Sequence, residues 1–222
     1  MSDAAVAVAL LSGGLDSGVA AALWQDAGNR LAVALHVDYG QLAAGREALA
    51  SQRLAERLQV PWQAIELPWL GELARRGGSA LVTGAVRALP ETDVEHPGDA
   101  DTAAAVWVPA RNVALIAAAA AVAETETADA VVVGFNREEA ATFPDNSDRF
   151  LAAMTAALEL GTRTGVVVAS PTVDLDKRGL VRAARRLGFG PADFWSCYRA
   201  DGDPATCRCE SCVRSRRAWR GE

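Results

Sequence analysis

The range Val6–Asp26 constrains the fold more than any other part of the chain. Its apolar run, Val6–Leu11, has the length and β-branched content of a buried strand. The run ends at Ser12-Gly13-Gly14, and residues 18–26 predict a helix. A glycine-rich turn between a strand and a helix points backbone N–H groups into one concavity, where the helix N-terminus adds partial positive charge. The pattern therefore predicts a phosphate-binding turn.

The residues of this turn exclude two familiar nucleotide-binding loops. The ATPase P-loop, G-x-x-x-x-G-K-[ST], requires a lysine that does not follow here, and the dinucleotide fingerprint G-x-G-x-x-G does not occur either. The turn instead has the form S-G-G-x-D-S over residues 12–17. This form resembles the pyrophosphate loop of enzymes that split ATP into AMP and pyrophosphate. The alternative is an ordinary strand–turn–helix corner, but the position directly after the first strand favours the loop.

Size and composition fit a single globular domain with a small appendage. The chain has 222 residues, of which 50% are hydrophobic and 23% are charged, and this is enough for a full core. The net charge of −6 argues against a broad nucleic-acid-binding face. Residues 1–5 lack the basic cluster of a signal peptide, and no segment supplies the roughly 20 strongly apolar residues of a membrane span. We therefore expect a cytoplasmic protein that binds neither nucleic acid nor membrane.

Strand and helix patterns alternate along the chain. Strands are predicted over residues 6–11, 31–37, 62–67, 130–134 and 166–169, and helices over residues 18–26, 42–59, 112–124, 148–160 and 177–187. Such alternation predicts an α/β fold with a doubly wound, five-stranded parallel sheet, and Asn112 is predicted to cap the third helix. Residues 71–105 interrupt the pattern, because they are rich in glycine and acidic residues, contain Pro90 and Pro97, and lack a sustained period. We expect a surface insertion or a mobile loop there.

The cysteines of the chain lie within its last 26 residues, at Cys197, Cys207, Cys209 and Cys212. In a cytoplasmic enzyme this clustering favours metal binding over disulfide formation. A tetrahedral zinc ion bound by the four thiolates is the preferred interpretation, because the tail has few strong hydrophobic residues and a metal would hold it against the domain. Four free buried thiols and an iron–sulfur cluster are the alternatives. The predicted division is a nucleotide-binding domain over residues 1–190 and a zinc-binding segment over residues 191–222.

Five groups of motifs carry a resemblance to a known family, and they occur in order over nearly the whole chain. They are Ser12-Gly-Gly-Leu-Asp-Ser17, Asp38-Tyr-Gly-Gln41, Val108-Pro-Ala-Arg-Asn112, Gly134-Phe-Asn136 with Phe143-Pro-Asp145, and Trp195-Ser-Cys-Tyr198 with the later cysteines. The chain resembles the 7-cyano-7-deazaguanine synthase (QueC) family of queuosine and archaeosine precursor biosynthesis. The resemblance implies an adenine nucleotide alpha hydrolase-like, Rossmann-like fold and a homodimer.

The resemblance also implies which residues form the site. The ATP-binding set is Leu11, Ser12, Gly13, Gly14, Leu15, Asp16, Ser17, Gly18, Asp38 and Arg111; the catalytic set is Asp16, Ser17, Arg111 and Lys177; the substrate-binding set is Tyr39, Gln41, Asn136, Phe143 and Asp145. Taken alone, Arg111 would be interpreted as the arginine of a surface ion pair. For Asp38 the alternative interpretation is a helix cap. For Lys177 it is a solvated lysine on its helix. His36 and His96 are interpreted as structural.

The implied reaction converts 7-carboxy-7-deazaguanine, ammonia and ATP to 7-cyano-7-deazaguanine, AMP and pyrophosphate, with Mg²⁺ and Zn²⁺ as cofactors. Three features depart from the family pattern: Ala110 replaces a usual glycine, Asn146-Ser147 replaces Cys-Arg, and one residue instead of two separates Cys207 from Cys209. These departures keep open a related ATP-dependent ligase with a different acceptor, such as a protein. A tRNA sulfur-transfer enzyme and a zinc-bound, ATP-binding partner protein without turnover are less favoured alternatives.

Overall fold

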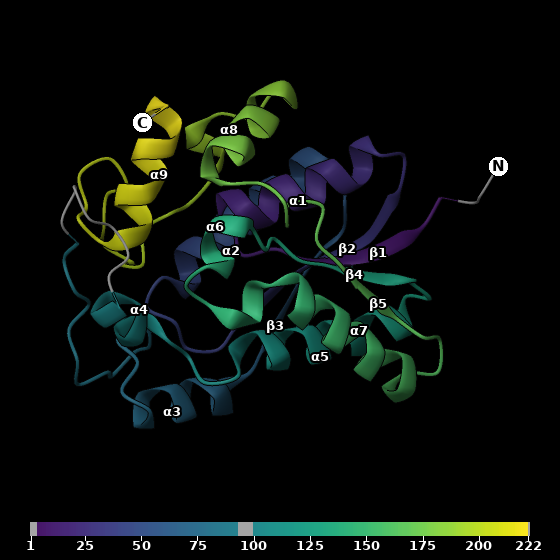
Figure 1. Ribbon diagram of the computed structural model, residues 1–222, viewed down its shortest axis with the longest axis horizontal. Coiled ribbons are helices and arrows are strands. Elements are labelled where there is room, and N and C mark those ends of the chain that lie inside the picture. The colour runs from purple at the N-terminus through teal and green to yellow at the C-terminus, as the bar shows by residue number, and fades with distance from the viewer. Residues whose placement is uncertain (1–3, 93–99, 222) are drawn as a thin grey trace.

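A five-stranded, all-parallel sheet forms the centre of the molecule (Figure 1). The computed structural model describes residues 4–92 and 100–221. The strands are β1 (Val6–Leu10), β2 (Arg30–Asp38), β3 (Trp62–Glu66), β4 (Ala130–Val132) and β5 (Val167–Ala169), in the spatial order β3-β2-β1-β4-β5. Each neighbouring pair in this order is parallel. The predicted α/β fold with a five-stranded parallel sheet is confirmed.

Helices cover both faces of the sheet (Figure 1). On one face lie α1 (Leu15–Asp26), α2 (Ala44–Leu58) and α8 (Lys177–Arg186), and on the other lie α5 (Arg111–Thr125) and α7 (Asp148–Gly161). Successive residues of a strand point to opposite faces. Ala7 of β1 therefore packs in the core that contains Leu180 of α8, whereas Val8 packs in the core that contains Ile116 of α5. These four side chains are buried, so each face of the sheet packs against its own apolar core.

The winding of the chain reverses next to β1. From β1 the chain proceeds to β2 and β3 on one side, and it later enters β4 and β5 on the other side. The connections that leave the carboxyl ends of β1 and β4 therefore diverge, and such a divergence opens a crevice at that edge of the sheet. The glycine-rich turn after β1 lies at this crevice, as does the segment 133–136 after β4.

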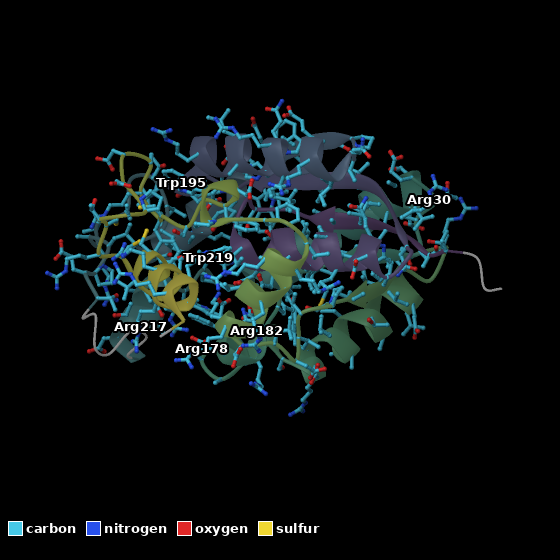
Figure 2. The ribbon with its side chains drawn as sticks, turned by 90° about the horizontal axis from the view of Figure 1, so that it is seen from above. Arg30, Arg178, Arg182, Trp195, Arg217 and Trp219 are labelled. Carbon is cyan, nitrogen blue, oxygen red and sulfur yellow. The ribbon has the colours of Figure 1, made fainter. Side chains whose placement is uncertain are left out.

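The remaining described elements are α3 (Pro68–Arg76), α4 (Ala100–Val106), α6 (Arg137–Ala140), α9 (Glu210–Arg220) and the short 3-10 turns η1 (Pro144–Asn146) and η2 (Pro191–Asp193). α9 lies beside α8 (Figure 1), where Ala218 and Trp219 join the core on the α1 face. Figure 2 shows Trp195 and Trp219 in this C-terminal segment. Arg185 of α8 donates to the backbone carbonyl of Trp219 at 2.7 Å. Apolar packing thus helps to attach the segment, and the boundary at residue 190 stays a prediction.

The segment 71–105 is more buried than the surface loop expected from the sequence. Its described part includes most of α3 and α4. Leu81 is buried in a cluster with Tyr39 and Val108. Leu81 lies in a turn, where side chains follow neither a helical nor a strand period, so a search for periodicity could not detect it. The expectations for Pro97 and His96 lie outside the described residues.

The alanine-rich helix α5 begins at Arg111, and Asn112 does not cap it as predicted. Ala110 occupies the N-cap position with φ 53° and ψ 24°. Asn112 is buried in the first turn, where its Nδ2 donates to the backbone carbonyl of Asp145 at 3.2 Å. Asn112 therefore bonds Asp145, a residue distant in the sequence, instead of capping its own helix. Among the described residues, no helix combines the length and the apolar character needed to cross a membrane.

Candidate active site

A cavity of about 320 Å³ lies at the carboxyl ends of β1, β2 and β4. Its walls come from the β1–α1 turn, the start of α5, the loop after β4 and the C-terminal segment. The predicted site residues that line it are Leu11, Ser12, Gly14, Leu15, Asp16, Ser17, Tyr39, Gln41, Arg111, Phe143, Asp145 and Lys177. Its volume is within the range of small-ligand pockets. Residues predicted from separate motifs thus meet in one cavity at the expected edge of the sheet.

Two glycines shape the turn after β1. Gly13 has φ +83°, and a Cβ at this position would lie 2.8 Å from the backbone oxygen of Glu47. Gly134, which follows β4, lies so close to the start of α1 that its Cβ would clash with the backbone nitrogen of Ser17. The Ser17 hydroxyl accepts the Ser12 N–H at 3.2 Å. This close packing leaves the N-terminus of α1 facing the cavity, where its N–H groups and partial positive charge suit an anion.

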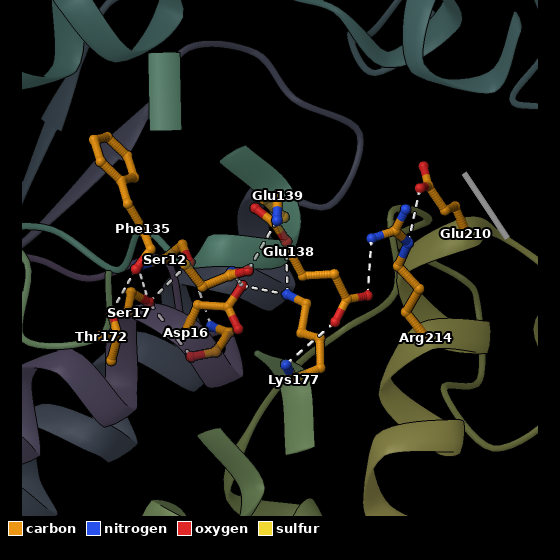
Figure 3. A network of polar contacts seen from close by, with 12 residues as sticks. Ser12, Asp16, Ser17, Phe135, Glu138, Glu139, Thr172, Lys177, Glu210 and Arg214 are labelled. Atoms are coloured by element: carbon orange, nitrogen blue, oxygen red, sulfur yellow. Dashed lines mark hydrogen bonds and ion pairs between the residues drawn. The ribbon is translucent and has the colours of Figure 1, made fainter. Parts of the chain in front are cut away.

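Lys177, the first residue of α8, forms the charged centre of the cavity (Figure 3). Its Nζ lies 2.5 Å from Oδ2 of Asp16 and 2.6 Å from Oε1 of Glu139. Only 14% of the Lys177 side chain is exposed, so Lys177 is not a solvated helix lysine. Its catalytic role stays a prediction.

The pKa values of this triad differ because each group balances burial against charge. Burial raises the pKa of Asp16 to about 6, although Lys177 opposes the shift. Burial would also raise the pKa of Glu139, but the charge of Lys177, the hydrogen bonds with Lys177 and Asp16, and the charge of Arg214 together outweigh it and lower that pKa to about 2. For Lys177, burial would lower the pKa, but the two carboxylates raise it above its usual value. The triad therefore holds a permanent ammonium beside one strongly acidic and one weakly acidic carboxyl group.

Arg111 supplies a second cation to the cavity. Burial would lower its pKa, but the neighbouring Tyr39 and Asp145 raise it. The Tyr39 N–H donates to Oε1 of Gln41 at 2.9 Å, and Nε2 of Gln41 donates to Glu47 at 2.9 Å. Three predicted residues, Tyr39, Gln41 and Asp145, thus belong to one polar group with the half-buried Arg111 guanidinium. This setting differs from that of a surface ion-pair arginine.

An aromatic pair lies in the wall beside this polar group. The rings of Phe143 and Trp107 have centroids 6.2 Å apart and planes at 13°, and both residues line the cavity with Asp145. A flat apolar surface of this kind suits a planar heterocycle. The sequence analysis identified Phe143 but missed Trp107. His36, which was interpreted as structural, is buried and stacks on Trp62.

The other predicted residues, Gly13, Gly18, Asp38 and Asn136, do not line the cavity. Oδ1 of Asp38 accepts the Gly40 N–H at 2.8 Å, which closes the turn after β2. Asn136 caps α6 by accepting the Glu139 N–H at 3.0 Å, and its Nδ2 donates to Oδ2 of Asp16 at 3.3 Å. These residues lie behind those that line the cavity and help to hold them in place. A contact of Asp38 with nucleotide, or of Asn136 with substrate, stays a prediction.

The four cysteines come together in what we call the cysteine cluster. Their sulfur atoms all lie within 4.8 Å of one another, an arrangement that suits one metal ion with four thiolate ligands. The Arg199 N–H donates to Sγ of Cys197, and the Cys209 N–H donates to Sγ of Cys207, both at 3.4 Å. Cys207 joins the cluster despite its unusual spacing, and Gly202 packs so tightly against Cys197 that a Cβ there would overlap its sulfur.

Sequence reasoning missed several acidic partners in the cavity. Glu139 binds Lys177, and Glu47 binds Gln41. Glu139 lies just after β4, at the edge of the sheet where ligands gather, and this position was a usable signal. Glu210 and Arg214 also line the cavity. No sequence signal marks these two, because only the folding of the C-terminal segment brings them there.

The fold and the cavity define a class: a nucleotide-binding α/β enzyme with an S-G-G-x-D-S loop at the carboxyl edge of its sheet and a separate cysteine cluster that could hold a metal. The family model described as queuosine biosynthesis protein QueC matches residues 6–222. The chain belongs to this family, and it is accordingly an ATP-dependent ligase of queuosine and archaeosine precursor biosynthesis.

Relatives named 7-cyano-7-deazaguanine synthase match this chain over nearly its full length. The protein from Methanothermobacter thermautotrophicus is 41% identical over 214 residues, which cover 96% of this chain and 93% of the relative. The protein from Pelotomaculum thermopropionicum is 44% identical over 215 residues, which cover 95% of each chain. Among solved structures, the NH3-dependent NAD synthetase from Campylobacter jejuni is a more distant match, with 18% identity, a TM-score of 0.48, and coverage of 85% of this chain and 66% of that chain.

Proposed function

We propose that the chain forms 7-cyano-7-deazaguanine from 7-carboxy-7-deazaguanine, ammonia and ATP, with release of AMP and pyrophosphate. The observation that carries this proposal is the single cavity in which the loop after β1, Arg111 and Lys177 converge. The same cavity has an aromatic wall for a flat heterocycle. Family membership and the names of the relatives supply the identity of the substrate.

The proposed chemistry turns a carboxylate into a nitrile through two activations by ATP. The substrate carboxylate is a poor electrophile; its oxygen attacks the α-phosphorus of ATP and displaces pyrophosphate, which gives an acyl adenylate. Ammonia then attacks the acyl carbon and displaces AMP, which gives the amide. The amide oxygen attacks the α-phosphorus of a second ATP, again with loss of pyrophosphate, and departure of AMP and of both N–H protons leaves the nitrile. Each nitrile therefore requires two molecules of ATP.

In this proposal the protein positions the reactants and stabilises charge. The N–H groups of the β1–α1 turn and the hydroxyls of Ser12 and Ser17 would bind phosphate oxygens at the positive end of α1. Arg111 would bind phosphate oxygens in a bidentate manner, and Lys177 would neutralise the departing pyrophosphate. Donors that are already in place lower the barrier without reorganisation during the reaction.

The heterocycle of the substrate would lie against the stacked rings of Trp107 and Phe143. Support comes from their parallel planes and from their place in the cavity wall. Tyr39, Gln41 and Asp145 would then offer polar groups to the edge of the ring. Such a mixture of apolar surface and a few fixed polar groups is typical of small-molecule sites.

Two metal ions complete the proposal. Oδ1 of Asp16 is buried and has no hydrogen-bond partner among the described residues, which fits Mg²⁺, an ion that binds through one or two carboxylates together with phosphates. Asp16 would hold Mg²⁺, which would offset phosphate charge. The cysteine cluster fits Zn²⁺, since four thiolates match the tetrahedral preference of that ion. Zinc there would be structural, because four protein ligands leave no open coordination position.

We also propose that the enzyme is a cytoplasmic homodimer that acts on small molecules and does not bind nucleic acid. The family resemblance supports the dimer. The net charge of −6 disfavours a nucleic-acid partner. Reduced thiols persist in the cytoplasm, where ATP is also available.

Mass spectrometry of the products tests the proposed reaction. Purified protein with 7-carboxy-7-deazaguanine, ammonium and MgATP should form the nitrile, with two AMP for each nitrile. Unchanged 7-carboxy-7-deazaguanine together with AMP formation on another acceptor would instead support a related ligase. No pyrophosphate release with any of these substrates would overturn the proposal in favour of an ATP-binding protein without turnover.

A further inference from the structure

A chain of ion pairs and one hydrogen bond connects the neighbourhood of the cysteine cluster to the charged centre of the cavity (Figure 3). Arg214 of α9 lies two residues after Cys212. Its Nη1 lies 3.2 Å from Oε1 of Glu138, and its Nε lies 3.0 Å from Oε1 of Glu210. The side chain of Arg214 is 13% exposed and that of Glu210 is 5% exposed. Burial of this degree distinguishes the Arg214–Glu210 pair from an ordinary surface ion pair, which contributes little, whereas Glu138 in the other pair is 41% exposed.

Glu138 extends this contact to Lys177. Its second oxygen, Oε2, accepts the backbone N–H of Lys177 at 3.2 Å. The neighbouring Glu139 binds Nζ of Lys177 at 2.6 Å. Both glutamates belong to α6, a helix of only four residues. A helix this short has little stability of its own, so its position depends on the partners that its side chains find.

The position of Arg214 depends in turn on the cysteine cluster. Cys209 is the N-cap residue of α9, and Cys212 lies in the first turn of that helix. A metal bound by the cluster would therefore fix the end of α9 from which Arg214 projects. None of the described cysteines lines the cavity, so any influence of the cluster on bound nucleotide has to pass through other residues.

We infer that Arg214 is a positioning residue, which holds α6 through Glu138 so that Glu139 can fix the Lys177 ammonium where the phosphates of ATP would bind. The inference rests on the proposed function. An arginine suits this place because its planar guanidinium spreads its charge over several nitrogens and can form ion pairs with two carboxylates in different directions. A lysine would offer a single point charge. By this route, a metal at the cysteine cluster supports nucleotide binding without touching the nucleotide.

Isothermal titration calorimetry with MgATP, replaced by a non-hydrolysable analogue where turnover interferes, tests the inference in the full chain. Arg214→Met should weaken binding by about tenfold, within the range of measured couplings between contacting residues, and Arg214→Lys should restore part of the loss. Arg220→Met is the matched control, because Arg220 is an exposed arginine at the end of the same helix. The control should bind like wild type, and Arg214→Met should keep its metal content.

Glu138→Gln provides a milder second variant. Arg214→Met leaves the buried Glu210 without this partner and risks a folding defect, whereas the Glu138 side chain is 41% exposed. Glu138→Gln removes the charge of the pair but keeps an oxygen that can accept the Lys177 N–H. We expect it to weaken nucleotide binding severalfold with an unchanged thermal midpoint. Wild-type affinity in both Glu138→Gln and a folded Arg214→Met would overturn the inference.

Removal of the metal with a chelator tests the connection to the cysteine cluster. Metal loss should weaken nucleotide binding to wild type, and it should weaken binding to Arg214→Met much less, because both changes release the same short helix. If metal loss weakened nucleotide binding by the same factor in wild type and in Arg214→Met, the two effects would be independent and the connection would be overturned. Nitrile formation by wild type is measured separately. Intact nucleotide binding without nitrile would contradict the proposed reaction while leaving the role of Arg214 in nucleotide binding supported.

Discussion

Replacement of Ala110 by glycine should stabilise the protein. Ala110 adopts φ 53° and ψ 24° at the N-cap of α5, in the left-handed region. A residue with a Cβ is strained there by roughly 1–2 kcal/mol, whereas glycine is not strained but loses roughly 0.5–1 kcal/mol more in conformational entropy on folding. Ala110 is exposed, so its methyl group contributes little packing. The difference predicts a rise of about 0.5–1 kcal/mol in the free energy of unfolding of Ala110→Gly.

Ala117 of the same helix provides a matched control. It is also exposed, but it lies inside α5, where Ala→Gly costs about 1 kcal/mol. Both variants remove one exposed methyl group and differ mainly in the backbone conformation at the site. We therefore expect the same chemical change to have opposite signs at the two positions.

Urea titration at equilibrium and thermal unfolding measure both variants. For a chain of this size, 1 kcal/mol corresponds to about 2–4 °C in Tm. Ala110→Gly should therefore melt about 1–4 °C above wild type, and Ala117→Gly about 2–4 °C below it. Equal losses in the two variants, with unchanged m-values, would refute the strained left-handed conformation at Ala110.

Three further changes test the cavity and the cysteine cluster. Gly202→Ala should lower the metal content well below that of wild type, because the new Cβ would overlap Sγ of Cys197; elemental analysis showing full metal content would contradict this packing. Arg111→Lys should lower kcat/KM for ATP by about tenfold or more, because one ammonium cannot reproduce a bidentate phosphate contact, and unchanged kinetics would exclude that contact. The value of kcat/KM should fall as the pH decreases through about 6, because Asp16 then takes up a proton and loses the charge with which it would hold Mg²⁺. A profile that stays flat across this pH would argue against an essential Asp16 carboxylate.

The parts of the fold that depend on local pattern were predictable from the sequence. The apolar run that begins at Val6, followed by Gly13 and Gly14, specifies a strand, a turn and a helix in that order. The alternation of such units then specifies the parallel sheet. Asn112 shows the limit of local reasoning, because its side chain reaches Asp145, 33 residues away, instead of capping its own helix. A local rule cannot anticipate a long-range partner.

The charged centre of the cavity was only partly predictable for the same reason. Lys177 and Asp16 are 161 residues apart, and the sequence alone left open whether Lys177 is solvated. The sheet decides this, because β5 brings the start of α8 to the same edge as the start of α1. Glu139 and Arg214 were missed because their roles depend on α6 and α9, which carry no recognisable pattern of their own.

The two carboxylates around Lys177 differ in a way that suits different tasks. Without ATP, Asp16 and Glu139 together neutralise a buried ammonium, which would otherwise be costly to keep charged. Glu139 has the lower pKa, about 2, and so it holds Lys177 throughout. Asp16 binds Lys177 through Oδ2 alone, and its buried Oδ1 has no hydrogen-bond partner among the described residues. Arriving phosphates would compete with Asp16 for the ammonium and release a carboxylate of the kind that binds a divalent cation. We therefore expect Glu139 to anchor Lys177 and Asp16 to exchange it for the metal that accompanies ATP, a division of roles set by two different environments.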